Sequence, residues 1–245
     1  AMNTAKVTSS PAAGAVRVSG DLHDSGPHSS STACDNELCW AVQHPAEVVN
    51  QNDGNCQNTQ PAPPGASSAA ACMPNAAGGI VDDMLVYRLA SDRFMLVVNA
   101  SNREKDWNWI QEQVTLHAWD ATVRDESDRY ALLAVQGPNA QDMVRRLGPA
   151  RADGLPWSEL AYYTFTLGKL MGNEVILSAT GYTGSGGLEI YMPMEAAESV
   201  WDALLSEGAV PCGLGARDTL RMEMGYCLYG NDLNDNTSPI SAGLG

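Results

Sequence analysis

Two side chains in the last third of the chain could together bind a flat heterocycle. Glu189 lies on a predicted strand between Leu188 and Ile190, and Arg217 opens a predicted helix. A carboxylate accepts hydrogen bonds, whereas a guanidinium donates several of them in one plane. Because aromatic residues lie near both positions in the sequence, we expect the pair to suit a pterin ring.

The same two residues also have a purely structural interpretation. An unpaired buried carboxylate is costly, so Glu189 and Arg217 could instead form an ion pair with each other. Arg221 lies one helical turn after Arg217 and could supply structural pairing on the same face. The sequence leaves both interpretations open.

Other polar clusters have simpler explanations. Asp82 and Asp83 precede an apolar strand, where two acids are usually a solvated turn but could also include a reaction carboxylate. The Gly184–Gly187 segment lacks the Lys-Ser/Thr pair of a phosphate-binding loop, which favours a tight turn. Asp232–Asn236 resembles the start of a calcium loop, but Thr237 stands at the glycine position of such a loop, so we expect no calcium there.

Composition excludes several classes of function. The 245 residues carry 14 Lys and Arg against 29 Asp and Glu, a net charge of −15. Nucleic-acid binding requires a basic surface, so we expect no nucleic-acid partner. No apolar run approaches the roughly 20 residues that span a bilayer, so we expect no membrane association. The six cysteines lack paired metal-ligand spacing, and we expect no metal.

Apolar periodicity from residue 80 onward predicts an α+β fold. The predicted strands are residues 80–89, 93–99, 131–135, 174–180 and 187–192, with the first two joined as a hairpin. Predicted helices begin at a Ser101–Glu104 capping box and at Gly137–Pro138, and a third carries an apolar stripe from Ala197 to Leu205. The elements do not alternate as regularly as in a parallel sheet, which favours α+β.

Residues 1–76 differ in character from the remainder. They contain almost no periodic apolar pattern and include polar or Pro-rich tracts such as His28–Thr32 and Gln60–Ser68. Too few large apolar residues are present to offset the entropy cost of ordering. We expect this low-complexity segment to be mostly disordered, and residues 77–245 to form the folded core.

Six ordered blocks between Asn75 and Gly245 resemble the aminomethyltransferase family, the T-proteins of the glycine cleavage system, and the wider folate-binding family around it. The blocks are Gly78–Asp83, Val97–Ala100 with Glu104–Asp106, Val135–Pro138, Gly181–Gly184, Gly213–Asp218 and Leu228–Asp232. Six blocks in order are far more specific than a lone glycine motif.

The resemblance implies a tetrahydrofolate-dependent aminomethyltransferase. It implies that Glu189 and Arg217 hold the pterin ring, that Asp83 is the reaction carboxylate, and that the rest of the site comprises Tyr163, Tyr182, Tyr226, Asn99 and Val97. It further implies a lipoylated carrier, the H-protein, that delivers an aminomethyl group; ammonia leaves and the one-carbon unit passes to tetrahydrofolate. A carboxylate would stabilise the positive charge that develops on the carbon, and could accept a folate proton.

The resemblance also implies the organisation of the molecule. We expect interlocked ferredoxin-like and antiparallel-sheet subdomains, with residues 77–126 and 212–245 in one and residues 127–211 in the other. The family's C-terminal β-barrel domain would follow Gly245, and residues 1–76 lack the family's Phe-Asp-x-Ser-His-Met-Gly stretch. We therefore expect a monomer that is truncated at its C-terminus and divergent over residues 1–76, located in the cytoplasm, or in the mitochondrial matrix if eukaryotic.

Relatives with the same cavity leave alternatives. A folate-dependent demethylase, or the folate domain of a sarcosine or dimethylglycine dehydrogenase, would share the cavity and act on another substrate. A non-catalytic folate-binding fragment or an iron–sulfur assembly relative would perform no transfer. Gly225–Asp232 does not reproduce the Lys-Gly-Cys-Tyr-x-Gly-Gln-Glu motif of the assembly relatives, and the Gly225–Pro239 stretch favours the aminomethyltransferases.

Overall fold

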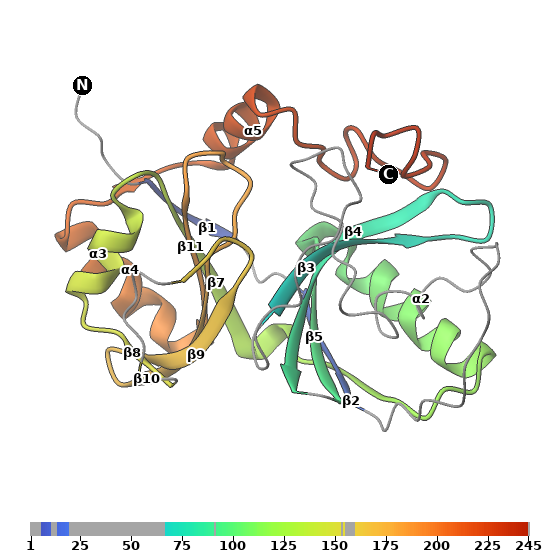
Figure 1. Cartoon of the computed structure of the whole chain (residues 1–245), viewed down its shortest axis with the longest axis horizontal. Helices are drawn as coiled ribbons and strands as arrows, with labels where there is room; N and C mark the ends of the chain where they lie inside the picture. The colour runs from blue at the N-terminus through green and yellow to red at the C-terminus, as the bar shows by residue number, and fades with distance from the viewer. Residues whose placement is uncertain are drawn as a thin grey trace. The chain divides into compact units, whose positions relative to one another are not determined.

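The computed structural model describes residues 6–10, 14–19, 67–90, 92–152, 154 and 160–244. The chain divides into two compact units, each built from two stretches of sequence. Unit 1 contains residues 1–13 and 127–227, and unit 2 contains residues 14–126 and 228–245. Figure 1 shows the elements of both units.

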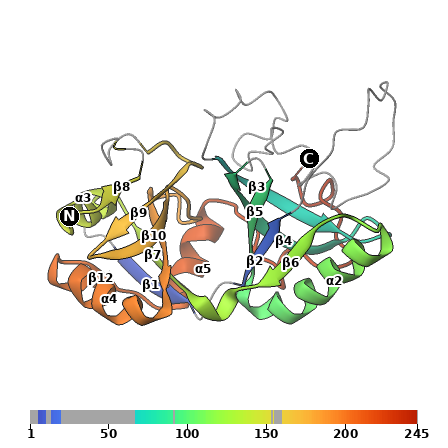
Figure 2. The same ribbon diagram turned by 90° about the horizontal axis from the view of Figure 1, so that it is seen from below.

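Within the described residues, unit 2 is an antiparallel sheet of five strands with one helix on it. The strand order is β3 (Ser67–Pro74), β4 (Ile80–Ala90), β5 (Arg93–Val98), β2 (Gly14–Ser19) and β6 (Thr122–Asp125). Helix α2 (Arg103–Leu116) follows the 3-10 turn η1 (Ala100–Asn102) and lies along one face of this sheet (Figure 2). The predicted β4–β5 hairpin is confirmed.

Alternating apolar residues form the core between this sheet and α2. The core side chains include Met84, Val86, Phe94, Leu96 and Val98 from the strands and Ile110 from the helix. Ile110 is fully buried and Trp107 packs beside it, so this face of α2 lies against the sheet. Because successive strand residues point to opposite faces, Asp83 and Val97 lie on the face away from this core.

Unit 1 is built on a larger sheet. Its described strands are ordered β12 (Val210–Pro211), β1 (Lys6–Ser10), β7 (Tyr130–Gln136), β11 (Gly187–Pro193), β10 (Asn173–Ser178), β9 (Phe165–Leu170) and β8 (Ala150–Arg151). Neighbouring strands are antiparallel except for β1 and β12, which are parallel. Mixed helices with two mainly antiparallel sheets confirm the α+β class.

Two helices cover one face of the sheet in unit 1 (Figure 1). They are α3 (Ala140–Arg146) and α4 (Ala197–Ser206). The 3-10 turn η2 (Ser127–Arg129) precedes β7, and the 3-10 turn η4 (Met194–Ala196) leads directly into α4. A third helix, α5 (Leu214–Glu223), follows β12. Val200 and Leu204 of α4 are fully buried against Val135 and Ile190. The predicted apolar stripe of α4 is therefore confirmed.

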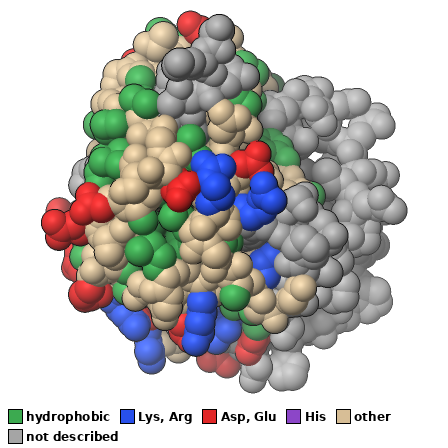
Figure 3. All heavy atoms as spheres, turned by 90° about the vertical axis from the view of Figure 1, so that its left-hand side faces the viewer, with side chains coloured by type: hydrophobic (Ala, Val, Ile, Leu, Met, Phe, Trp, Pro, Cys, Tyr) green, Lys and Arg blue, Asp and Glu red, His purple; other side chains and the backbone are tan. Residues whose placement is uncertain are grey.

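Charges of both signs are interspersed on the side of the molecule that carries α3 and α4 (Figure 3). Two ion pairs here are Arg146 with Glu207 at 2.5 Å and Arg145 with Asp142 at 2.8 Å. Exposed ion pairs contribute about 0–1 kcal/mol each. The buried strand and helix residues therefore account for most of the stability of this unit.

Residues 228–245 pack onto unit 2 after the chain leaves unit 1. The Ile80 N–H donates to the carbonyls of Asn234 and Thr237 at 3.2 and 3.0 Å, and Leu233 is fully buried. Asn75 Nδ2 donates to the Asp235 carbonyl at 2.8 Å. Gly79 is required at this contact, because a Cβ there would lie 1.7 Å from the Asp235 oxygen.

Three predicted helix starts are wrong by a few residues. α2 begins after Asn102, not after the predicted cap Ser101, which lies in the 3-10 turn η1, and it has no side-chain cap hydrogen bond. α3 begins at Ala140, not at Pro138, because Gly137 has a φ of 118° and turns the chain first. α5 begins at Leu214, so Arg217 lies inside the helix and does not open it.

The division of the chain also differs from the predicted one. The boundary falls near residue 228 and not at 212, because α5 and the turn after it belong to unit 1. Within the segment 1–76, β1, β2 and β3 form strands, so the expected disorder is wrong for these stretches. The partners of β1 and β2 lie far away in sequence, whereas β3 pairs with the next strand, β4. The expectation for residues 20–66 lies outside the described residues.

No helix in the described part of the chain combines the length and apolar composition needed to cross a lipid bilayer.

Candidate functional site

Glu189 offers an unused acceptor on the face of β11 opposite the helices. Its neighbours Leu188 and Ile190 point into the core of unit 1, whereas Glu189 is 5% exposed on the other face. Thr180 Oγ1 donates to Glu189 Oε2 at 2.5 Å, and the Tyr191 hydroxyl lies 3.5 Å from the same oxygen. Within the described residues Oε1 accepts no hydrogen bond, so the carboxylate is held in place with one oxygen available.

Arg217 lies on α5 with one buried donor atom, Nε, that has no partner among the described residues. The side chain is 8% exposed. The guanidinium carbon lies 4.4 Å from the ring centroid of Tyr182, a cation–π contact. Burying a guanidinium N–H without an acceptor is costly, so this Nε is a candidate donor to a bound molecule.

Glu189 and Arg217 do not form an ion pair with each other in the described structure, so the purely structural interpretation is wrong for them. Arg221 makes the structural pairing instead, with its Nε and Nη2 donating to Asp218 Oδ1 at 2.8 and 2.6 Å. One side of α5 therefore carries one satisfied and one unsatisfied arginine.

The C-terminal cap of α5 positions Tyr226. Gly225 has a φ of 74°, and the Tyr226 N–H donates to the Arg221 carbonyl at 2.9 Å while the Gly225 N–H donates to Met222 at 3.0 Å. These two bonds form a Schellman motif, which ends a helix with a left-handed residue. Arg221 Nη1 also donates to the Tyr226 carbonyl at 3.1 Å, which fixes this turn.

Tyr163 and Tyr182 complete the aromatic part of the site. Tyr163 has a φ of 60°, rare for a residue other than glycine, and its N–H donates to the Ala179 carbonyl at 3.0 Å. Burial raises the pKa of both phenols; Glu189 raises the pKa of Tyr182 further, whereas Arg217 opposes the rise. Both rings therefore keep their hydroxyl protons at neutral pH and can donate hydrogen bonds.

Gln136, at the end of β7, supports the loop that carries Tyr182. Its Nε2 lies 3.2 Å from the carbonyls of Thr180 and Leu188, and its Oε1 accepts a bond from Thr183 Oγ1 at 2.9 Å. Gly181, with a φ of 144°, allows this approach because a Cβ would lie 2.2 Å from Gln136 Oε1. Sequence reasoning missed this role, although Gln136 lies inside one of the family blocks.

In unit 2, Asn99 links the two adjacent acids of β4. Its backbone N–H donates to Asp82 Oδ2 at 3.0 Å, and its Nδ2 donates to Asp82 Oδ1 at 2.9 Å and Asp83 Oδ1 at 3.0 Å. Asp82 is fully buried toward α2, whereas Asp83 is partly exposed on the other face of the sheet beside Val97. The structure thus brings Asp83, Asn99 and Val97 together.

The surroundings of Asp83 alter its acidity. Burial, and after it the negative charge of Asp82, raise the pKa of Asp83 from 3.8 to about 6, while the hydrogen bond from Asn99 lowers it. Asp83 is therefore ionised at neutral pH but close enough to its pKa to exchange a proton. The interpretation of Asp82 and Asp83 as a solvated turn is wrong, since Asp82 is buried.

Two further residues of unit 2 were not singled out from the sequence. Lys105 Nζ donates to the Val81 carbonyl and to the Tyr229 hydroxyl, the latter at 2.7 Å, and lies 4.0 Å from the Tyr229 ring centroid. Asp106 is fully buried beside Asp82. No local signal identifies either interaction, because each joins α2 to a distant segment.

Comparison with known proteins places these features in a family. The sequence profile of the GCVT N-terminal domain family matches residues 53–245. The aminomethyltransferase of Phocaeicola vulgatus is 52% identical over 179 residues, which are 71% of this chain and 47% of that protein. The aminomethyltransferase of Halothermothrix orenii is 49% identical over 172 residues, covering 69% of this chain and 46% of that protein. The chain thus spans about half the length of these relatives.

Solved structures agree with the fold. The glycine cleavage system aminomethyltransferase T from Bartonella henselae has a TM-score of 0.72 and 27% identity, and the match covers 97% of this chain and 56% of that one. A heterotetrameric sarcosine oxidase from a Corynebacterium species has a TM-score of 0.50 and 15% identity, over 90% of this chain and 88% of that one, which shows a similar fold alone.

Proposed function

Because the chain belongs to the GCVT N-terminal domain family, we propose that it is the tetrahydrofolate-binding part of a glycine cleavage aminomethyltransferase. It moves the one-carbon unit of an aminomethyl group from the lipoyl arm of the H-protein to tetrahydrofolate and releases ammonia. The observation that carries this proposal is the buried Nε of Arg217, which has no partner among the described residues, in the same unit as the carboxylate of Glu189, which Thr180 holds through Oε2.

These groups fit a pterin. A pterin ring is flat and presents both N–H donors and nitrogen or oxygen acceptors at its edge. Glu189 accepts from the ring N–H groups, and Arg217 donates in a plane to the acceptors. Thr180 fixes the carboxylate, and Tyr163, Tyr182 and Tyr226 supply aromatic surface and hydroxyl donors. The ring would satisfy the buried Arg217 Nε, which has no partner among the described residues.

Asp83 is the reaction carboxylate in this proposal. Tetrahydrofolate supplies the nitrogen nucleophiles that accept the one-carbon unit. As the amine leaves, positive charge develops on the transferred carbon, and an ionised Asp83 stabilises that charge. With a pKa of about 6, Asp83 also accepts a proton from a folate nitrogen at neutral pH. Asn99 holds the carboxylate through Oδ1.

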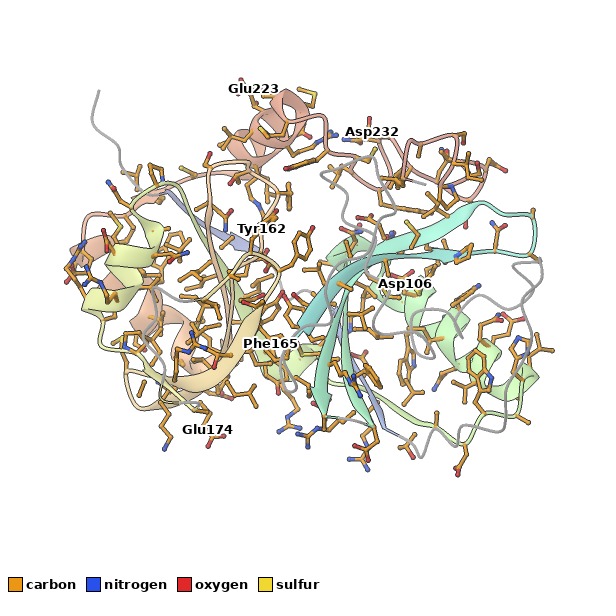
Figure 4. The ribbon with its side chains drawn as sticks, in the orientation of Figure 1. Asp106, Tyr162, Phe165, Glu174, Glu223 and Asp232 are labelled. Carbon is orange, nitrogen blue, oxygen red and sulfur yellow. The ribbon has the colours of Figure 1, made fainter. Side chains whose placement is uncertain are left out.

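Binding and transfer test separate parts of the proposal. Calorimetry should detect tetrahydrofolate binding by this chain. Glu189→Gln should weaken the binding roughly 10- to 100-fold, since it replaces a charged acceptor. Glu174→Gln is the matched control, because Glu174 is exposed at the distant end of the same sheet (Figure 4) and should bind normally. Equal affinities in both variants would overturn the assignment of Glu189.

The transfer step is tested with aminomethylated H-protein as donor. In a protein that carries these residues and releases ammonia, Asp83→Asn should lower the rate by about 10² to 10⁴-fold with little change in folate affinity. Asp92→Asn, an exposed acid in the same hairpin, should leave the rate unchanged. Transfer from sarcosine or dimethylglycine but not from the H-protein would instead favour a demethylase.

A further inference from the structure

The buried acid Asp106 has no role in the function proposed above. It lies in the first turn of α2, on the side facing the sheet of unit 2 (Figure 4), and is fully buried. Neither of its carboxyl oxygens has a hydrogen-bond donor among the described residues. An ionised carboxylate in this position would be buried without compensation, which a folded protein avoids by neutralising the group.

The group that faces Asp106 is a second carboxyl, that of Asp82. Asp82 already accepts three hydrogen bonds: Asn99 N–H and Nδ2 donate to its two oxygens at 3.0 and 2.9 Å, and Asn102 Nδ2 donates at 2.8 Å. These three donors compensate a negative charge on Asp82. Two carboxyl groups can bond to each other only if one of them carries a proton. Asp106, which lacks donors, is the one that carries it.

The other charges around Asp106 do not reverse this assignment. Asp83, on the same strand as Asp82, disfavours a further negative charge, and Lys105 on α2 favours one. Lys105 is already bound to the Val81 carbonyl and the Tyr229 hydroxyl. Burial, followed by Asp82, raises the pKa of Asp106 from 3.8 to about 9. The positive end of a helix offsets only about 0.3–1 kcal/mol, less than one pKa unit.

We propose that Asp106 is a positioning residue for Asp83: as a neutral carboxylic acid it donates a hydrogen bond to Asp82 and thereby fixes the Asn99 amide that holds Asp83. Asn99 Nδ2 joins the two, since it donates to Asp82 Oδ1 and to Asp83 Oδ1 at 2.9 and 3.0 Å. The importance of Asp83 rests on the proposed function, whereas the proton on Asp106 and its connection to Asn99 do not.

The first test measures the proton through stability. Asp106→Asn keeps a donor of the same shape but cannot ionise. Between about pH 5 and 8 the folded wild-type protein holds a proton that the unfolded chain has lost, so its folding equilibrium constant should fall by up to tenfold per pH unit relative to that of Asp106→Asn. Urea unfolding of both proteins at each pH, monitored by pulsed hydrogen exchange of β4 and α2 peptides, gives the ratio of their folding equilibrium constants.

The control is Glu104→Gln, which removes an exposed acid from the same turn and should follow the wild-type pH dependence. A constant ratio between Asp106→Asn and the wild type over this pH range would show that Asp106 is ionised and would overturn the proposal.

The second test measures the connection to Asn99. Carbon-13 NMR should show the Asp106 carboxyl carbon titrating in the alkaline range, and the Asn99 side-chain amide carbon shifting with the same midpoint in the wild type but not in Asp106→Asn. If the Asn99 chemical shift does not change as Asp106 titrates, the positioning role of Asp106 is overturned. If the protein does not bind tetrahydrofolate but both NMR results are as expected, only the proposed function is contradicted. The Asp106–Asp82 pair is then still established.

Discussion

Three aspartates of unit 2 show how surroundings decide the chemistry of one residue type. Asp82 is buried but receives three hydrogen bonds, so both of its oxygens have donors inside the protein. Asp106 is buried without donors and holds a proton. Asp83 is partly exposed, receives one side-chain amide, and titrates at about 6. Only the last combines ionisation at neutral pH with access for a substrate.

The acidity of Asp83 predicts a pH dependence of activity. The proposed transfer requires the ionised form, so its rate should rise as the pH increases through about 6 and become constant above about 7. A pH–rate profile on single turnovers checks this expectation. The residual rate of Asp83→Asn should lack the rise, and an unchanged rise in that variant would assign the titration to another group.

The same residue should affect stability in the opposite direction. The folded pKa of Asp83 lies above its unfolded value of 3.8, so its favourable contribution is complete below about pH 3.8 and is lost as the pH rises through 6. Asp83→Asn should therefore be more stable than the wild type at pH 8, by at most about 3 kcal/mol. Urea unfolding at pH 8 measures this difference, with Asp92→Asn as the neutral control. A less stable Asp83→Asn protein would contradict it.

At the scale of elements, local sequence patterns predicted which helices and strands exist better than they predicted where those elements begin. The β4–β5 hairpin and α4 follow from alternation and helical periodicity, because each buries its own apolar face. The start of α2 does not follow, because the predicted cap Ser101 lies in the 3-10 turn η1 and α2 has no side-chain cap hydrogen bond.

Two neighbouring glycines in unit 1 give a matched test of close packing. A Cβ on Gly187, at a φ of 143°, would lie 2.5 Å from the Val135 carbonyl oxygen, whereas one on Gly186, at a φ of 70°, would meet nothing within 4 Å. Gly187→Ala should lower the free energy of unfolding by roughly 2–4 kcal/mol, and Gly186→Ala by only about 1–2 kcal/mol. Thermal or urea unfolding checks the order; the reverse order would contradict the β7–β11 geometry.

At the scale of the whole molecule, each unit is assembled from separated stretches of sequence. Residues 228–245 complete unit 2, although the rest of that unit ends at residue 126. Lys105 and Tyr229, 124 residues apart, form a direct hydrogen bond. Stability of unit 2 therefore depends on a segment synthesised after all of unit 1.

Removal of residues 228–245 should destabilise unit 2 selectively. The deletion removes the buried Leu233 and the bonds to Asn75 and Ile80, which together stabilise the unit by roughly 3–6 kcal/mol. Hydrogen exchange followed by mass spectrometry should show lost protection in β4 and α2 and normal protection in β9 and β10. Ile240→Ser, at an 83% exposed position of the same segment, is the control and should change neither unit. Equal loss in both units would contradict this division.

The amino-acid sequence alone was sufficient for the family, the α+β class and most strands and helices, because the family blocks and apolar periodicities are properties of short segments. It also proposed Glu189, Arg217 and Asp83 as candidates. The folded structure decided their states: which arginine is satisfied, which aspartate holds a proton, and which stretches of residues 1–76 join a sheet. The states of the aspartates depend on donors such as Asn99, 16 and 17 residues away from Asp83 and Asp82, and on burial. The pairing of β1 and β2 likewise depends on distant strands, and no local pattern contains these partners.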